Sequence, residues 1–192
     1  MGNANCNRAS IADRFVAHSA TAGFTIAETA IALALLGVLL AAAVPAYADW
    51  IAAYQLRNYA EHLSGSIAFA RSEALTRATR VTMCPSTGSR CGGAADWGNG
   101  WIVYVDADGD GSLGDSESVV RTERVPVPDI RVSANRPLES YVSFTALGHA
   151  RLVNGALQMG TFVACRRGQR AIRVVLANSG RVRLDKTTDA CP

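Results

Sequence analysis

The segment "TAGFTIAETAIALALLGVLLAAAVPAYADW", residues 21–50, decides the fold of this chain. It contains 20 consecutive uncharged residues, Thr29 to Ala48, between Glu28 and Asp49. At a rise of ~1.5 Å per residue a helix of that length covers about 30 Å, the thickness of the hydrocarbon core of a bilayer. We therefore predict one membrane-spanning helix with a single carboxylate, Glu28, at its start.

A carboxylate in a membrane segment costs about 2.5–3.5 kcal/mol on insertion scales, so Glu28 needs a cationic partner. The nearest basic residues, Arg14 and Arg57, lie too far along a helix to reach it. Cleavage of the chain after Gly23 would create an α-amino group nearby. Residues 1–23 are polar and contain no apolar core, which distinguishes them from an ordinary secretory signal. The basic residues ahead of the apolar run favour a cytoplasmic N-terminus.

The motif "GFTIAE", residues 23–28, resembles the prepilin peptidase site of type IV pilins and type II secretion pseudopilins. Pro45 is similar to a proline found in the same helix of that family. The resemblance implies that prepilin peptidase cuts after Gly23 and that Phe24 becomes an N-methylated terminus. It also implies that Glu28 pairs with the Phe24 amine of a neighbouring subunit during filament assembly. The alternative is a plain single-span anchor with an isolated glutamate.

The 192 residues, of which 49% are hydrophobic, are enough for one membrane helix and one globular domain of modest size. Beyond Pro45, apolar residues recur every three or four positions while charged residues occupy other faces. The helix is therefore predicted to continue as an amphipathic one to about Thr79. Its apolar positions are Leu56, Tyr59, Leu63, Ile67, Ala70 and Ala74.

From Val81 onward, short runs rich in β-branched and aromatic residues alternate with Gly, Asn, Pro and Ser, which predicts antiparallel strands joined by tight turns. The nine predicted strands are 81–84, 100–106, 118–125, 129–133, 141–148, 150–153, 157–165, 170–178 and 180–185, with "ANSG", residues 177–180, as a hairpin connection.

The predicted fold class is α+β. A long N-terminal α-helix, transmembrane in its lower half and amphipathic in its upper half, packs on a C-terminal antiparallel β-rich head. The predicted divisions are a leader (1–23), a transmembrane helix (24–48), an amphipathic helical stem (49–80) and the head (81–192).

Cysteine usage agrees with a head in an oxidising compartment, because cleavage removes Cys6 and leaves an even number. The four remaining cysteines permit three pairings, and proximity in the sequence favours Cys84 with Cys91 and Cys165 with Cys191. The rival is a zinc site, but the spacing lacks the compact C-x-x-C pairs that such sites use.

The segment "DADGDGSLGDSE", residues 106–117, matches the calcium-loop pattern D-x-D-x-D-G-x5-E of an EF-hand. Asp106, Asp108, Asp110 and Glu117 would supply the oxygen ligands. The segment follows a predicted strand, whereas an EF-hand loop follows a helix, and short Asp/Gly runs are common in solvated hairpins. We interpret it first as a polar hairpin loop and keep a Ca²⁺ site as the alternative. No other cofactor is required.

Charge is segregated along the chain. Residues 145–192 contain eight basic and two acidic residues, a net charge of +6, whereas residues 24–144 carry a net charge of −4. In "GRVRL", residues 180–184, the two-residue period of a strand places Arg181 and Arg183 on one face, about 7 Å apart. Two guanidinium groups at this spacing can each bind a phosphate oxygen.

"GNGWIVYVD" and "GRVRL" resemble the minor-pilin family that contains FimT and the H-type pseudopilin GspH. The resemblance implies a pilin-like fold, and a GRxR motif formed by Gly180, Arg181 and Arg183 that binds double-stranded DNA without sequence preference. Gly180 would allow a ligand to approach the backbone closely. Two alternatives are a solvated edge strand whose arginines discourage edge pairing, and a basic patch that docks a neighbouring subunit. Supporting basic residues would be Arg166, Arg167, Arg170, Arg173 and Lys186.

The sequence predicts no enzyme, since His149 is the only histidine of the head and no nucleophile, base and orienting group stand out as a set. It predicts a minor pilin or pseudopilin that crosses the bacterial inner membrane once, with a periplasmic head, and enters a pilus or pseudopilus. Its partners would be other pilins or pseudopilins, the assembly platform, prepilin peptidase and DNA. The alternative function is an H-type pseudopilin of a type II secretion system, without a DNA role.

Overall fold

The computed structural model describes residues 23–92, 97–124, 127 and 129–191. The predicted leader lies outside these residues, apart from Gly23. The chain forms two compact units, Met1–Ala43 and Val44–Pro192.

The first unit consists, in its described part, of the beginning of helix α1 (Ile26–Arg77), whose later turns belong to the second unit. The helix starts after Thr25, whose Oγ1 accepts a hydrogen bond from the Glu28 backbone N–H at 3.2 Å and so caps the first turn. Every described residue of this unit is exposed. By length and composition α1 can cross a membrane. An exposed apolar surface of this kind is suited to burial in a lipid bilayer or in the core of a filament.

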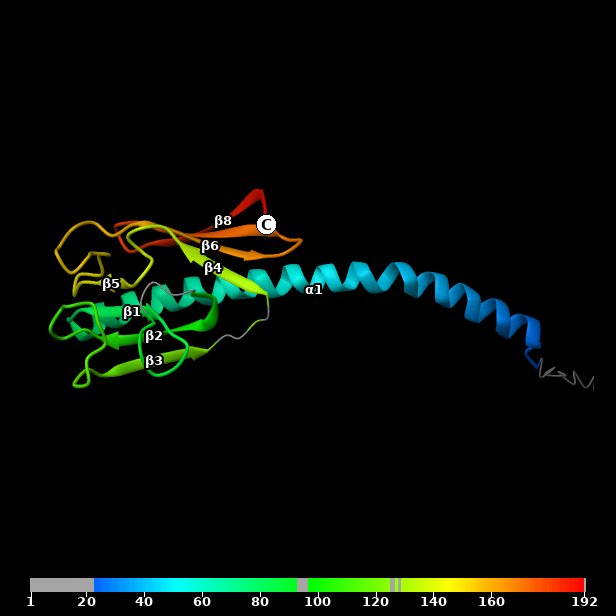
Figure 1. Ribbon diagram of the computed structural model, residues 1–192, viewed down its shortest axis with the longest axis horizontal. Helices are drawn as coiled ribbons and strands as arrows, with labels where there is room; N and C mark the ends of the chain where they lie inside the picture. The colour runs from blue at the N-terminus through cyan, green and yellow to red at the C-terminus, as the bar shows by residue number, and fades with distance from the viewer. Residues whose placement is uncertain (1–22, 93–96, 125–126, 128, 192) are drawn as a thin grey trace, which may run out of the picture. The chain divides into compact units, whose positions relative to one another are not determined.

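Helix α1 continues through Pro45 without a break in its assignment and ends at Arg77, two residues before the predicted end. In the second unit it packs along two four-stranded antiparallel sheets (Figure 1). The first sheet has the order β3-β2-β1-β5 and contains β1 (Val81–Pro85), β2 (Gly100–Val105), β3 (Val119–Arg124) and β5 (Val142–Phe144).

The second sheet has the order β4-β6-β7-β8, so that β8 is an edge strand. It contains β4 (Ile130–Ala134), β6 (Gly160–Arg166), β7 (Arg170–Leu176) and β8 (Val182–Ala190), and a short 3₁₀ turn, η1 (Trp97–Asn99), precedes β2. Both sheets are antiparallel, as predicted.

The hydrophobic core lies between the amphipathic part of α1 and both sheets. All six apolar positions predicted for this helix face are buried, which confirms the helical periodicity. Trp97 and Phe162 meet edge to face with ring centroids 5.2 Å apart, and the Trp97 indole N–H donates to the Leu138 and Glu139 carbonyls at 3.2 Å. Burial of large side chains of this kind stabilises a fold by about 1.5–3 kcal/mol each.

Some predicted strands are shorter than expected, and one is absent. Residues 150–153 form only isolated bridges at Ala150 and Arg151, because Leu152 closes a tight turn by donating to the Ala156 carbonyl at 2.9 Å. The strand predicted from residue 180 begins at Val182 instead. The predicted hairpin connection at 177–180 is confirmed by a hydrogen bond from the Gly180 N–H to the Ala177 carbonyl at 2.9 Å.

The head contains two disulfide bonds among its described residues, and both join the cysteines that proximity in the sequence favoured. Cys84 and Cys91 join β1 to the loop that follows it, with Cα atoms 5.5 Å apart. Cys165 in β6 pairs with Cys191, immediately after β8, with Cα atoms 5.4 Å apart. The pairing leaves none of these four cysteines available as a zinc ligand.

Candidate functional site

The first candidate site is the start of α1. Phe24 is 81% exposed, and Glu28 is exposed in the first helical turn, where the positive end of the helix dipole favours a carboxylate. Residues 23–43 include no Lys, Arg or His, so this described part of the first unit supplies Glu28 with no side-chain cation. A partner of opposite charge must come from elsewhere.

The second candidate site is the loop between β2 and β3, which contains the predicted calcium ligands. It connects two strands and therefore lacks the helices of an EF-hand. Asp106 is 1% exposed, and its Oδ2 accepts a hydrogen bond from Thr82 Oγ1 at 2.7 Å. Glu117 accepts backbone N–H bonds from Ala107 at 2.8 Å and Gly114 at 3.0 Å, which fold the loop back on itself.

Three of the four predicted ligands come together. Carboxylate oxygens of Asp106, Asp108 and Glu117 lie within 4.8 Å of one another, and Asp110 is not part of this group. Asp110 instead accepts the Ser112 N–H at 2.7 Å in a local turn. The site contains three clustered carboxylates, one of them deeply buried.

Sequence reasoning missed Tyr104, which precedes Asp106 by two positions and is fully buried. Burial first, and then the neighbouring carboxylates of Asp106 and Glu117, raise the pKa of the Tyr104 hydroxyl above its usual range, so it stays a proton donor. The two-residue period of a strand was the available signal, because it places residues 104 and 106 on the same face.

The third candidate site is the basic C-terminal segment, and the structure divides it. Arg166, Arg167 and Arg170 lie at the β6–β7 turn, whereas Arg181 lies at the β7–β8 turn. These turns are at opposite ends of β7, about 20 Å apart for a seven-residue strand. The run of basic residues in the sequence is therefore not one surface patch.

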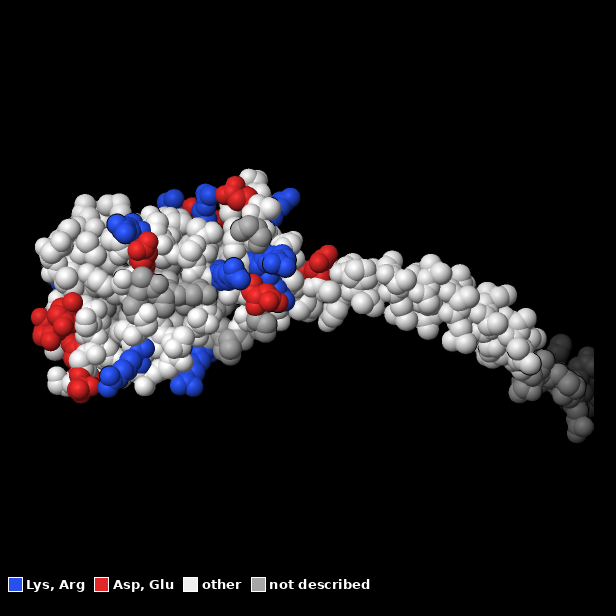
Figure 2. Space-filling model, viewed as in Figure 1, with Lys and Arg blue, Asp and Glu red and all other residues white. Residues whose placement is uncertain are grey.

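Aspartates accompany two of these arginines. Arg173 pairs with Asp189 at 2.6 Å, and Arg183 pairs with Asp185 at 3.0 Å. The face drawn in Figure 2 also shows acidic side chains beside basic ones in several places. Local pairing of this kind lowers the potential that a distant phosphate would experience.

The GRVR segment, residues 180–183, occupies the β7–β8 turn and the first residues of β8. Gly180 is buried with φ of +78°, and a Cβ there would lie 2.4 Å from the Gly148 carbonyl oxygen. Arg71 of α1 donates to that same oxygen at 2.9 Å. The close backbone approach that we predicted for a ligand at Gly180 is therefore made by the protein itself.

Arg181 and Arg183 are both exposed, but Arg181 precedes the strand, so a strand's alternation does not set its direction. Val182 packs at the margin of the core, as expected for the opposite face, whereas Leu184 is 40% exposed.

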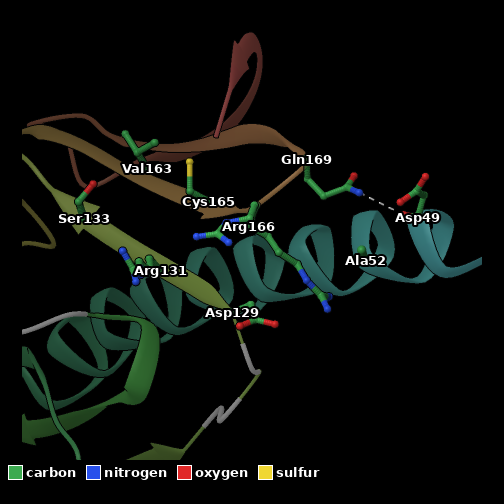
Figure 3. A pocket seen from close by; sticks show the side chains of 10 residues that line it. Asp49, Ala52, Asp129, Arg131, Ser133, Val163, Cys165, Arg166 and Gln169 are labelled. Carbon is green, nitrogen blue, oxygen red and sulfur yellow. Dashed lines mark hydrogen bonds between the residues drawn. The ribbon is translucent and has the colours of Figure 1, made fainter. Parts of the chain in front are cut away.

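A groove near the β6–β7 turn was not predicted. Figure 3 shows Arg131 of β4 and Arg166 of β6 facing it, beside the turn of α1 that carries Asp49. Gln169 Nε2 donates to the Asp49 carbonyl at 3.4 Å, and Arg166 donates to Gln55 Oε1. Arg131 is 35 positions from Arg166 in the sequence, and only the pairing of β4 with β6 brings them together.

The fold that carries these sites is that of a pilin-like protein. The structure is similar to a crystal structure of the type IV minor pilin FimU of Pseudomonas aeruginosa, with a TM-score of 0.56 and 21% identity over 72% of this chain and 96% of that one. A second crystal form of FimU matches with a TM-score of 0.49 and 19% identity over 71% of this chain and 99% of the other.

The chain belongs to the family described as type II transport protein GspH, whose model matches residues 59–180. No curated protein sequence is significantly similar to it. Family and fold are those of structural pilin subunits. The match ends at Gly180, so Arg181 and Arg183 lie beyond it, as does the segment from Gly23 to Glu28.

Proposed function

We propose that this chain is a minor pilin or pseudopilin that assembles through its N-terminal helix into a type IV filament. Prepilin peptidase removes the leader after Gly23 on the cytoplasmic side, and Phe24 becomes the methylated terminus. The mature subunit then remains in the inner membrane, with its head in the periplasm, until it assembles with other subunits at the assembly platform.

The observation that carries this proposal is the position of Glu28. It lies in the first turn of an exposed apolar helix, in a segment without a cation, residues 23–43. A carboxylate in hydrocarbon is tolerated when it is paired, and a free amine at Phe24 of the next subunit is a pair of the right charge. Cleavage creates that amine, so processing and assembly are linked.

The Glu28→Val variant tests the assembly step. We expect it to be cleaved normally and to remain in the membrane, but to be lost from sheared or purified filaments, because the partner amine then has no counter-charge. Glu61→Val is the matched control, since Glu61 is a carboxylate of the same helix that pairs with Arg57 at 2.7 Å on an exposed face. Normal incorporation of Glu28→Val would contradict the proposal.

We further propose that Arg181 and Arg183 bind the phosphates of double-stranded DNA. Support comes from their exposure at the start of an edge strand, where both guanidinium groups are accessible. Phosphate contacts of this kind are independent of sequence and sensitive to salt, as uptake of arbitrary DNA requires. Arg183 must exchange its Asp185 partner for a phosphate, which lowers the net gain.

The second candidate function is an H-type pseudopilin of a secretion system, in which basic residues dock a neighbouring subunit. The groove of Arg131, Arg166 and Arg167 favours it, because these side chains combine with Asp49 and Asp129 in one recess. Mixed charges in a recess suit a complementary protein surface better than a uniformly negative polymer.

A DNA titration of the full mature chain in detergent separates these functions. We expect Arg181→Ala with Arg183→Ala to weaken binding about tenfold and to reduce the salt slope by roughly two charges. The control is Arg166→Ala with Arg167→Ala, which removes the same charge from the other end of β7. Equal losses in both double variants would indicate general electrostatics, and no binding by the unmodified chain would favour the docking function.

A further inference from the structure

Two buried polar atoms have no hydrogen-bond partner among the described residues: Tyr104 Oη near the end of β2, and Asp106 Oδ1 in the loop that follows β2. Asp106 is 1% exposed and Tyr104 is fully buried, so bulk solvent does not reach either side chain. Buried polar atoms in folded proteins are nearly always satisfied by protein, by ordered water or by an ion. Both atoms therefore have free hydrogen-bonding capacity for an ordered water molecule or an ion.

The surrounding charge indicates what kind of group that is. The carboxylates of Asp106, Asp108 and Glu117 have oxygens within 4.8 Å of one another, and among the described residues none of the three forms an ion pair. Carboxylates packed this closely repel one another unless a cation lies between them. A water molecule would satisfy the hydrogen bonds but leave the repulsion in place.

We propose that Asp106, Asp108 and Glu117 bind a Ca²⁺ ion that ties the β2–β3 loop to the first sheet. Calcium takes oxygen ligands at about 2.3–2.6 Å, so two ligand oxygens on opposite sides of one ion lie nearly 5 Å apart, which the observed 4.8 Å spread accommodates. Magnesium demands shorter bonds and near-ideal octahedral geometry, and it retains most of its water.

Two of the three ligands, Asp106 and Glu117, are held in place by separate contacts. Thr82 Oγ1 donates to Asp106 Oδ2 and leaves Oδ1 for the ion, while the Ala107 and Gly114 N–H groups orient Glu117. Remaining ligands are water molecules and loop carbonyls, as is usual for calcium.

The proposal is independent of the filament function, because it rests on this loop alone. It also differs from the EF-hand that the sequence pattern suggested, since strands replace both helices and Asp110 is not a ligand. Asx turns at Asp108 and Asp110 occur in any polar hairpin. The buried, unpartnered Asp106 oxygen does not, and it distinguishes a metal site from an ordinary loop.

The test is a thermal melt of the full mature chain in detergent, in EDTA and in 5 mM CaCl₂, together with calorimetric titration of Ca²⁺. We expect a dissociation constant on the order of 10⁻⁴ to 10⁻³ M, as in extracellular modules, and a rise in melting temperature of about 5 °C. The same concentration of MgCl₂ should raise it by less than half as much.

Asp108→Asn and Asp106→Asn should each weaken calcium binding at least tenfold, which reduces the rise in melting temperature at 5 mM CaCl₂ by at least half. Asp108 is exposed, so its variant folds even if replacement of the buried Asp106 is disruptive. Asp115→Asn is the matched control, because Asp115 lies in the same loop, is fully exposed and pairs with Arg90 at 3.9 Å. An unchanged melting temperature of the unmodified chain, or equal losses in Asp115→Asn and Asp108→Asn, would overturn the proposal.

Discussion

The two sheets of the head differ in how they distribute residues of like charge: the first brings acidic residues together, and the second separates basic ones. In the first sheet, the acidic residues of one loop come together, and three carboxylates share a small volume. In the second sheet, the basic residues of one sequence segment are spread along the β6–β7–β8 hairpins and divided between their two ends. Nearness in sequence becomes nearness in space within a loop, but a strand carries its residues about 3.3 Å further apart at every step.

Removal of a disulfide should have the largest effect on stability of the changes considered for the two sheets. One disulfide closes a short loop in the first sheet, and the other closes a long loop in the second. In the chain-entropy model, loss of the Cys165–Cys191 bond, with a separation of 26, costs roughly 3.5 kcal/mol of unfolding free energy. Loss of the Cys84–Cys91 bond, with a separation of 7, costs roughly 2.4 kcal/mol.

Urea unfolding followed by the fluorescence of the buried tryptophans measures both losses in double Cys→Ser variants. Serine at both positions avoids a free thiol in either variant. If removal of the Cys84–Cys91 bond cost more than removal of the Cys165–Cys191 bond, loop length would not govern the stability of the head.

The β6–β7 turn and the β7–β8 turn each contain a glycine at φ of +78°, Gly168 and Gly180, but the surroundings of the two glycines differ. Gly168→Ala meets no atom within 4 Å, so we expect a cost of about 1 kcal/mol from the left-handed backbone alone. Gly180→Ala places a Cβ against the Gly148 carbonyl and the Arg71 side chain, which raises the cost to about 3 kcal/mol.

The same urea unfolding checks these glycine variants. Equal costs at the two positions would mean that Gly180 is kept for reasons other than internal packing. A larger cost at Gly180 would show that the first residue of the GRVR segment is structural, whatever its arginines bind.

The smallest expected effect concerns the aspartates that accompany the arginines. Asp185→Asn frees Arg183 and removes a negative charge, so we expect DNA to bind two- to threefold more tightly, while stability changes by less than about 0.5 kcal/mol for an exposed pair. Asp189→Asn removes the same charge but releases Arg173 instead, and it serves as the control. An identical gain in both variants would point to net charge instead of the GRVR segment.

Much of the fold was predictable from local patterns. The apolar spacing from Leu56 to Ala74 predicted the buried face of α1, and alternation with turn residues predicted eight strands that the structure contains. The missing ninth strand, at 150–153, lies where a tight turn within Leu152–Ala156 satisfies the backbone. Local periodicity does not show whether a segment's backbone groups will pair in a strand or in a tight turn.

The candidate sites were predicted less completely. The acidic loop was recognisable because its ligands follow one another closely, but the burial of Asp106 and the part played by Tyr104 depend on how β1 and β2 pair. The groove that joins Arg131 to Arg166 was missed, because its residues come from strands paired across a long connection.

Helical length, hydrophobic period and cysteine spacing are local properties, so the order of the amino acids is enough to predict a helix of membrane-spanning length before a disulfide-bonded β-rich head. The places where charge gathers depend instead on how the strands pair and pack. Antiparallel pairing sends successive turns to opposite ends of a sheet, so it separated Arg181 from Arg166 and Arg167. Packing of α1 against the β7–β8 turn likewise fills the space beside Gly180 with the Gly148 carbonyl and the Arg71 side chain, so a ligand does not reach this backbone.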